Sequence, residues 1–272
     1  MNTHKKLLLT AVSALGLCLS PLHAEFIPLL LDFGPTTPTG ANLTNSPYHA
    51  VSGASFETWN ILGTSDVASG LLWGNGTAAT GVTLDLGVSG DNNTVNESII
   101  DFSTQPSSSS ALGGRTNTGV FDGNSVGKDA IFNSGSPQLG LKIGGLALDT
   151  YYVYVVGINT NLGNFASNPN DGNLIPMNIG ALATGDVATL DTDGLSAVNI
   201  PNNVFSSWSQ GANYARFEVT LTNDNPYLTI FTYDNSNRGF LNAVQIVAIP
   251  EPGTLVLLGI ALGTLLIFRR RQ

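Results

Sequence analysis

The sequence contains very little cysteine and very little positive charge. Its one cysteine, Cys18, lies near the N-terminus of a 272-residue chain. The 10 lysines and arginines are outnumbered by 19 acidic residues, and the formal net charge is −9. Nucleic-acid-binding proteins need a basic surface, so this charge balance excludes nucleic acid as a partner. Zinc and iron sites need several cysteine or histidine ligands, and their scarcity excludes such sites.

Residues that favour exposed helices are also scarce. Residues 25–249 contain two lysines and four glutamates, whereas glycine, asparagine, serine and threonine are abundant. These abundant residues are typical of turns and of exposed strand faces. Several segments alternate apolar and polar side chains with the period of two that a half-buried strand requires. The clearest are 82–88 and 215–221.

The pattern predicts about ten short strands and no amphipathic helix. We expect strands at 27–33, 55–61, 71–73, 82–88, 99–102, 130–132, 151–156, 215–221, 227–233 and 241–247. Short strands separated by turn residues indicate an all-β fold, here an antiparallel jelly-roll sandwich over residues 25–249. The stretches 103–114 and 159–213 have few strand signals, and we expect them to be surface loops.

The first 24 residues have the features of a secretory signal peptide. Lys5 and Lys6 precede an apolar run over 7–19, and Ala24 ends a plausible cleavage site. Cleavage there would remove Cys18, and the mature chain would contain no cysteine. An exported protein without disulfides depends on its hydrophobic core, aided by any ions it binds.

The C-terminal segment 250–272 has three parts in a fixed order: a Pro-Glu-Pro motif, fifteen uncharged residues over 254–268, and an arginine cluster. The charged and proline positions are Pro250, Glu251, Pro252, Arg269, Arg270 and Arg271. An apolar helix followed by arginines stops in a membrane, with the arginines on the cytoplasmic side and the preceding domain on the outer side. Fifteen residues give about 22 Å of helix against a hydrocarbon core of roughly 30 Å, so the predicted transmembrane helix is short.

This tail resembles the PEP-CTERM sorting signal of Gram-negative bacteria. The resemblance implies recognition by an exosortase, a membrane-embedded processing enzyme, at the six positions named above. It also implies export linked to extracellular polysaccharide production. An ordinary C-terminal anchor is the alternative interpretation.

The middle of the chain, residues 25–249, resembles a recurring ectodomain of bacterial PEP-CTERM proteins that is similar to galactose-binding-like jelly rolls. The resembling segments are 31–34, 59–60, 145–154, 208–214 and 239–247. The resemblance implies contact with carbohydrate or matrix, and it carries over no common catalytic residues. We call residues 25–249 the ectodomain from here on.

Three tryptophans are candidates for sugar binding, because aromatic faces flanked by polar side chains bind sugars. They are Trp208, Trp73 and Trp59. Trp208 lies among serines with no apolar alternation, so we expect it to be an exposed platform. Trp59 and Trp73 lie in expected strands, where a tryptophan commonly belongs to the core.

Oxygen ligands for calcium are abundant in this acidic chain. Asp191 and Asp193 form the densest group, and Asp32 near the start of the sandwich is a second candidate. Paired carboxylates would also serve a glycosidase. However, most of these acids are aspartates in turn contexts, such as Asp122 before Gly123 and Asp171 before Gly172, where aspartate shapes the backbone. His49, the one histidine of the ectodomain, has no nucleophile-elbow motif around it.

The sequence therefore predicts an exported, non-catalytic β-sandwich of the cell envelope or the extracellular space. Its expected partners are the secretion machinery, an exosortase, the membrane through its C-terminal helix, and extracellular polysaccharide. Calcium is the one cofactor that the composition suggests. The alternatives are a secreted polysaccharide-degrading enzyme and a purely structural matrix protein.

Overall fold

A computed structural model describes residues 26–34, 43–87, 97–101, 119–121, 124–133, 138–157, 175–183, 195–200, 206–233 and 239–249. All of these residues except Phe26 belong to one compact unit, Ile27–Ile249. Its strands are β1 (Leu29–Phe33), β2 (Asn60–Leu62), β3 (Thr83–Gly87), β4 (Glu97–Asp101), β5 (Asp129–Asn133), β6 (Gln138–Gly144), β7 (Thr150–Val156), β8 (Ile175–Leu182), β9 (Ser196–Ile200), β10 (Ala215–Thr220), β11 (Tyr227–Tyr233), β12 (Phe240–Leu241) and β13 (Ala243–Ala248). The helical elements are α2 (Pro47–Ser52) and the 3₁₀ turn η2 (Gly119–Phe121).

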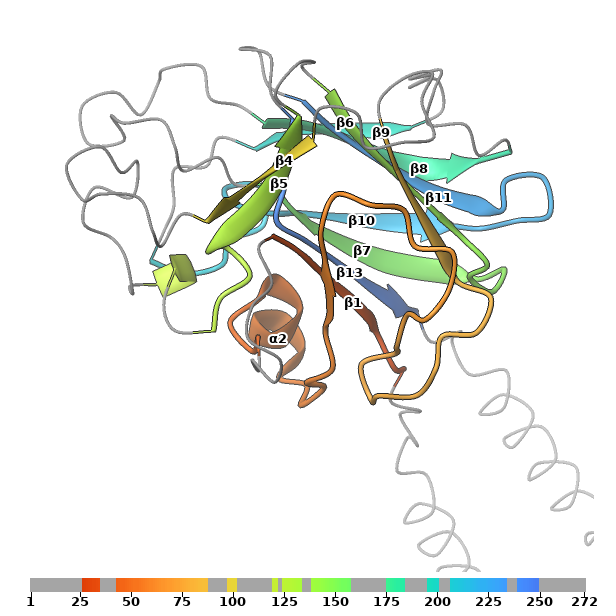
Figure 1. Cartoon of the computed structure of the whole chain (residues 1–272), viewed down its shortest axis with the longest axis horizontal. Coiled ribbons are helices and arrows are strands. Elements are labelled where there is room, and N and C mark those ends of the chain that lie inside the picture. Colours follow the sequence, from red (N-terminus) through yellow and green to blue (C-terminus); the bar gives the residue numbers. More distant parts are fainter. Residues whose placement is uncertain are drawn as a thin grey trace, which may run out of the picture. The chain divides into compact units, whose positions relative to one another are not determined.

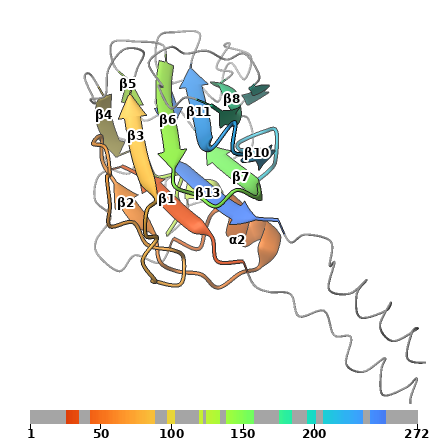
Figure 2. The same cartoon turned by 90° about the vertical axis from the view of Figure 1, so that its right-hand side faces the viewer.

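Two five-stranded sheets form the body of the unit (Figure 1). The first sheet has the strand order β10-β7-β13-β1-β2, and the second has the order β3-β6-β11-β8-β9. A small third sheet, β12-β5-β4, lies to one side (Figure 2). Among the strands that the structure describes, each pairing is antiparallel except that of β1 with β2, which is parallel. The predicted all-β antiparallel sandwich is confirmed.

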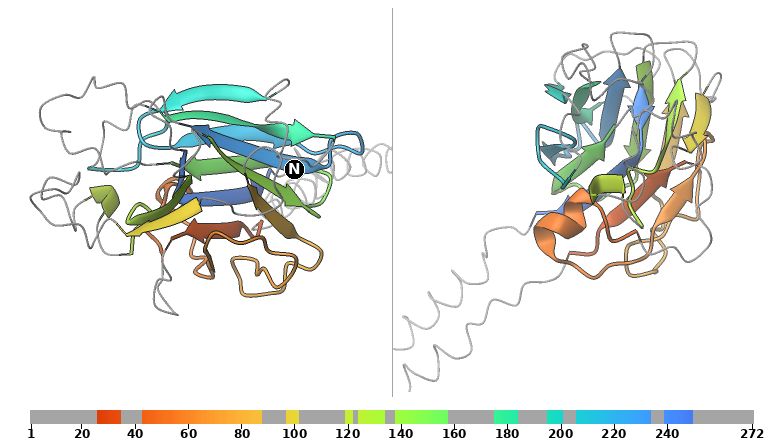
Figure 3. Two further views of the ribbon diagram at one scale, coloured as in Figure 1. Left: turned by 45° about the horizontal axis from the view of Figure 1, so that its top comes forward. Right: turned by 90° about the vertical axis from the view of Figure 1, so that its left-hand side faces the viewer.

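Alternating side chains place the core between the two large sheets. On β10, Ala215 and Val219 are buried, whereas Arg216 and Glu218 are exposed. The alternation of apolar and polar residues in the sequence therefore matches the alternation of core-facing and solvent-facing side chains. Strand β1 is an exception, because all five of its residues are buried. One face of β1 is turned toward the second sheet, and α2 lies near the other face (Figure 3).

The sequence prediction was wrong about the stretch 159–213, which contains β8 and β9 as well as loop segments. Strand β8 includes a proline, an asparagine and a glycine, residues with low strand propensity. It forms because β11 pairs with one of its edges and β9 with the other. Cross-strand pairing between distant segments outweighs local propensity here.

Two predicted strands are shorter or missing. The segment 55–61 contributes only the start of β2, and 71–73 forms a tight loop with one isolated bridge, Leu72 to Ala78. The short helix α2 was not predicted either. Its signals are local: Ser46 caps its start, Pro47 opens its first turn, and Gly53 ends it with a φ of 64°.

Some sequence predictions lie outside the described residues. They are the signal peptide at 1–24, the loop at 103–114, and the tail at 250–272 with its expected transmembrane helix. Within the described ranges, no helix has the length and apolar character needed to cross a bilayer.

Candidate functional site

Helix α2 is fixed to the first sheet by a buried group of polar side chains. The hydroxyl of Ser46 donates to Nδ1 of His49 at 2.6 Å, and Nε2 of His49 donates to the carbonyl oxygen of Phe56 at 2.7 Å. A carbonyl can only accept, so the ring proton is assigned to Nε2. Gln245 on β13 donates to the Ser46 hydroxyl at 2.6 Å and accepts from the backbone N–H of Tyr48 at 2.9 Å.

This serine–histidine contact lacks the geometry of a catalytic pair. A hydrolase histidine uses one nitrogen to activate the nucleophile and bonds the other to an orienting group, commonly a carboxylate. Here the second nitrogen is bonded to a backbone carbonyl, and Ser46 is 0% exposed. Burial lowers the pKa of His49, opposed by the Phe56 hydrogen bond and by the charge of Glu57. The contact therefore supports a structural role for His49.

A continuous series of ring contacts runs from Trp59, beside β2, through α2 and β7 to Trp208. Neighbouring ring centroids are 5.5 to 6.5 Å apart, a spacing at which aromatic pairs attract each other. In order, the rings are Trp59, His49, Tyr48, Tyr154, Tyr214 and Trp208. Two of the three predicted sugar-binding tryptophans are thus the two ends of one packed series.

Trp208 is half-buried and packs against the hydrophobic core. Its indole Nε1 donates to Oδ1 of Asn45 at 2.7 Å, and Asn45 donates in turn to the carbonyl oxygen of Gly119 at 2.8 Å. The polar atom of this tryptophan is therefore already bonded within the protein. Sugar binding by Trp208 stays a prediction, and its ring has a structural role as well.

The other two predicted tryptophans pack against the same core. Trp59 is buried and stacks on His49, and its Nε1 has no hydrogen-bond partner among the described residues. Trp73 is half-buried in the tight loop before β3, where its backbone N–H donates to the carbonyl oxygen of Thr77 at 2.8 Å. Sugar binding by either residue stays a prediction.

The candidate calcium ligands are not brought together in the described part of the chain. Asp32 lies on β1 and is 1% exposed, while Asp191 and Asp193 fall outside the described residues. Among the described residues, no group of three or more histidine, cysteine, aspartate or glutamate side chains could hold a metal ion. A calcium site stays a prediction of the sequence.

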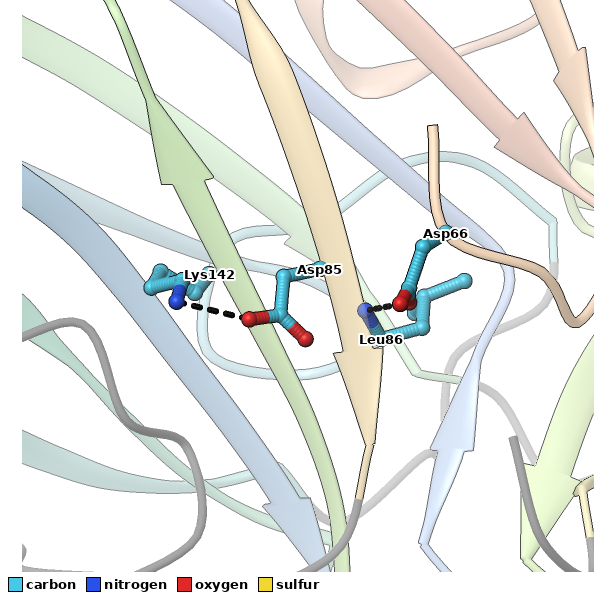
Figure 4. A network of polar contacts seen from close by, with 4 residues as sticks. All are labelled: Asp66, Asp85, Leu86 and Lys142. Carbon is cyan, nitrogen blue, oxygen red and sulfur yellow. Dashed lines mark hydrogen bonds and ion pairs between the residues drawn. The ribbon is translucent and has the colours of Figure 1, made fainter. Parts of the chain in front are cut away.

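A second polar–aromatic group lies on the second sheet, and the sequence analysis did not identify it. Lys142 on β6 forms an ion pair with Asp85 on β3, with 2.6 Å between Nζ and Oδ2 (Figure 4). The side chains are 19% and 23% exposed. Nζ of Lys142 also lies 5.6 Å from the ring centroid of Tyr227 on β11. We call Asp85, Lys142 and Tyr227 the β3–β6–β11 cluster.

The strand that carries Lys142 does show a sequence signal. In β6, Leu139, Leu141 and Ile143 alternate with Gly140, Lys142 and Gly144, which is the period of a half-buried strand. The glycines lower its strand propensity, and they explain why the segment was missed. The nearby loop reinforces the edge of β3, because Asp66 Oδ1 accepts from the backbone N–H of Leu86 at 2.9 Å (Figure 4).

Comparison with known proteins identifies the tail. Residues 248–271 match the family described as the PEP-CTERM protein-sorting motif. The predicted sorting signal is therefore confirmed, and it indicates export and association with the cell envelope. No curated protein sequence matches this chain.

Several solved structures are similar to the fold at low sequence identity. The ANXUR2 extracellular domain from Arabidopsis thaliana is 10% identical, with a TM-score of 0.34 over 82% of this chain and 42% of that one. A family 35 carbohydrate-binding module from Clostridium thermocellum is 10% identical, with a TM-score of 0.27 over 44% and 78%. TmCBM61, solved with β-1,4-galactotriose, is 10% identical, with a TM-score of 0.26 over 61% and 88%. The chain thus spans less than half of the plant ectodomain.

Proposed function

We propose that this protein is an exported component of the cell envelope or extracellular matrix that binds extracellular polysaccharide without modifying it. The sorting motif at residues 248–271 carries this proposal, since it indicates export and processing by an exosortase. The β-sandwich before it offers rigid sheet faces and loops, on which binding sites are commonly built. In this role the ectodomain holds polysaccharide while the tail determines where the protein is delivered.

The sorting function is tested at Glu251. The apolar stretch and the arginines account for membrane insertion, whereas insertion alone gives no reason for an acid between two prolines. We expect Glu251→Gln to leave full-length precursor in the membrane, because the isostere keeps the shape and removes the charge. We expect deletion of 250–272 to release the protein into the periplasm or the medium. Immunoblots of fractionated cells report both size and location.

The matched control is Glu218→Gln, which removes one negative charge from an exposed position on β10. This variant should be processed like the unmodified protein. If Glu251→Gln also has normal size and location, the tail acts as an ordinary anchor and the sorting interpretation is wrong.

The binding function is tested on the full-length protein, purified in mild detergent. Isothermal titration calorimetry against dextran, mannan, galactan, xylan and polygalacturonate should detect binding to at least one polysaccharide. A reducing-sugar assay on the same mixtures should show no release of sugar ends. Release of sugar ends would favour the polysaccharide-degrading enzyme, and binding to none of the polymers would favour a structural matrix protein.

A further inference from the structure

The β3–β6–β11 cluster lies on the outer face of the second sheet, the face turned away from the first sheet. Leu84 and Leu86 of β3 and Leu141 and Ile143 of β6 belong to the buried core. Side chains alternate along a strand, so Asp85 and Lys142, each between two core residues, face the other way. They are also direct partners in the β3–β6 register, which brings their side chains together.

Two buried glycines flank the half-buried lysine on this face. On the outer face of β6, Lys142 stands between Gly140 and Gly144, two positions without side chains. A Cβ at Gly144 would lie 3.2 Å from the ring of Tyr227 and 3.0 Å from the hydroxyl of Thr83. A side chain at 144 would therefore crowd the tyrosine ring, which would have to shift by a few tenths of an ångström. The glycine allows the half-exposed Tyr227 ring to lie close against β6, beside the ion pair.

Two polar side chains on this face have no hydrogen-bond partner among the described residues. Thr229 is the register partner of Lys142, and its Oγ1 is unpartnered although the residue is 1% exposed. Asn178 pairs with Phe231, two residues along β11, and its Oδ1 is unpartnered at 7% exposure. Native proteins rarely leave buried polar groups unsatisfied, so the two atoms mark this part of the sheet as unusual.

The chemistry of the cluster fits a sugar. An aromatic ring offers a face for the C–H side of a pyranose, and a few charged or amide groups beside it fix the hydroxyls. A sugar hydroxyl both donates and accepts. The ammonium group of Lys142 can only donate, and the ionised Asp85 carboxylate can only accept, so the pair meets both needs.

Charge selects the class of polysaccharide. The positive charge of Lys142 is balanced by Asp85, so the cluster has no excess positive charge to attract an anionic polymer. The whole chain has a formal net charge of −9, which repels polyanions such as polyuronates. A neutral polymer meets no such repulsion.

We propose that the outer face of the second sheet, at Asp85, Lys142 and Tyr227, binds a neutral polysaccharide. One pyranose lies against the Tyr227 ring, and its hydroxyls bond to Lys142 and Asp85. This assignment rests on the proposed function, and it adds a binding site and a class of ligand to it.

The first sheet supplies a matched control. On its outer face the Arg216 guanidinium lies over the Tyr152 ring, 4.8 Å from the centroid, so a cation again meets a tyrosine on an exposed strand. Lys142→Met and Arg216→Met each remove one positive charge and keep an apolar stem. Tyr227→Ala and Tyr152→Ala each remove one half-exposed ring.

The experiment titrates full-length protein in mild detergent with dextran, mannan, galactan and xylan, and with polygalacturonate as the anionic probe. We expect neutral polymers to bind better than polygalacturonate. Lys142→Met and Tyr227→Ala should each weaken that binding about tenfold or more, and Arg216→Met and Tyr152→Ala less than about twofold. Unchanged thermal midpoints for the methionine pair would show that lost binding is not lost folding.

The remaining outcomes each contradict one part of the proposal: the site, the class of ligand or the proposed function itself. If the unmodified protein binds and Lys142→Met binds equally well, the assignment of the site is wrong and the proposed function stands. Equal weakening by the Arg216 and Tyr152 variants would also refute the assignment. Preference for polygalacturonate would overturn the ligand class. Binding to none of the polymers would overturn the proposed function, and the assignment with it.

Discussion

At the scale of single residues, His49 shows how burial gives a common side chain a structural role. Its ring is held by Ser46 on one side and by the Phe56 carbonyl on the other, within reach of the rings of Tyr48 and Trp59. The Ser46 bond requires an unprotonated Nδ1, because that nitrogen must accept. A second proton would break this bond and place a charge in a buried site.

This arrangement predicts a specific pH dependence of stability. Burial lowers the pKa of His49 below its ordinary value of 6.5 in the folded state. The unfolded chain then binds more protons, and the stabilising contribution, complete above pH 6.5, is lost as pH falls toward the folded pKa. Urea unfolding at pH 7, 6 and 5 should show a falling free energy of unfolding.

The control for this prediction is His49→Gln. His49 is the one histidine of residues 25–249, and ordinary carboxyl pKa values lie near about 4. The decline between pH 7 and pH 5 should therefore be much smaller in the glutamine variant. An equally steep decline in both proteins would mean that another group is responsible.

At the scale of elements, the turn between β6 and β7 is fixed by one glycine. Gly145 has a φ of 76°, and a Cβ there would overlap the carbonyl oxygen of Gly81, in the segment that leads into β3. Only glycine permits both the backbone conformation and the close approach of the two segments. The turn therefore helps to hold β3 against β6, and with it the register of Asp85 and Lys142.

Gly145→Ala should lower the free energy of unfolding by about 3 kcal/mol or more, since it adds a clash to the cost of the backbone conformation. Gly211 is a matched control, with a φ of 77° and no atom within 4 Å of an added Cβ. Gly211→Ala should lower the free energy of unfolding by only about 1 kcal/mol, because it strains the backbone conformation without adding a clash. Equal losses in chemical denaturation would show that the contact with Gly81 has no effect on stability.

At the scale of the whole molecule, the ectodomain must fold without covalent crosslinks. The one cysteine of the sequence, Cys18, lies outside residues 25–249. A single hydrophobic core joins the inner faces of both large sheets, as with Leu31 and Val153 of the first sheet and Leu141 and Ile230 of the second. A core that spans two five-stranded sheets provides the stability that small secreted domains obtain from disulfides.

We expect residues 25–249 alone to fold into a β-rich protein whose thermal midpoint is unchanged by reducing agent. Far-ultraviolet circular dichroism measures the strand content, and a thermal melt with and without dithiothreitol measures the midpoint. A spectrum dominated by helix would contradict the fold.

The same melt with calcium and with chelator tests the predicted ion, because a ligand bound only by the native state raises the midpoint.

Local patterns account for what the sequence alone determined. The shortage of helix formers and the period-two segments predicted an all-β sandwich, and strands such as Tyr227–Tyr233 were located correctly. The sorting motif was found because its parts are contiguous in the chain, so it is read without a fold. The lack of cysteine in residues 25–249 excluded disulfides in the ectodomain for the same reason.

The tertiary structure decided everything that depends on residues distant in sequence. Strands β8 and β9 exist through their pairing partners, and Ser46 meets Gln245 across 199 positions. Asp85, Lys142 and Tyr227 come from three separate strands, and no linear motif joins them. The surroundings of Trp208 predicted an open platform, but Asn45, 163 positions away, binds its indole nitrogen. Such contacts are set by sheet register and by packing, which local sequence does not encode.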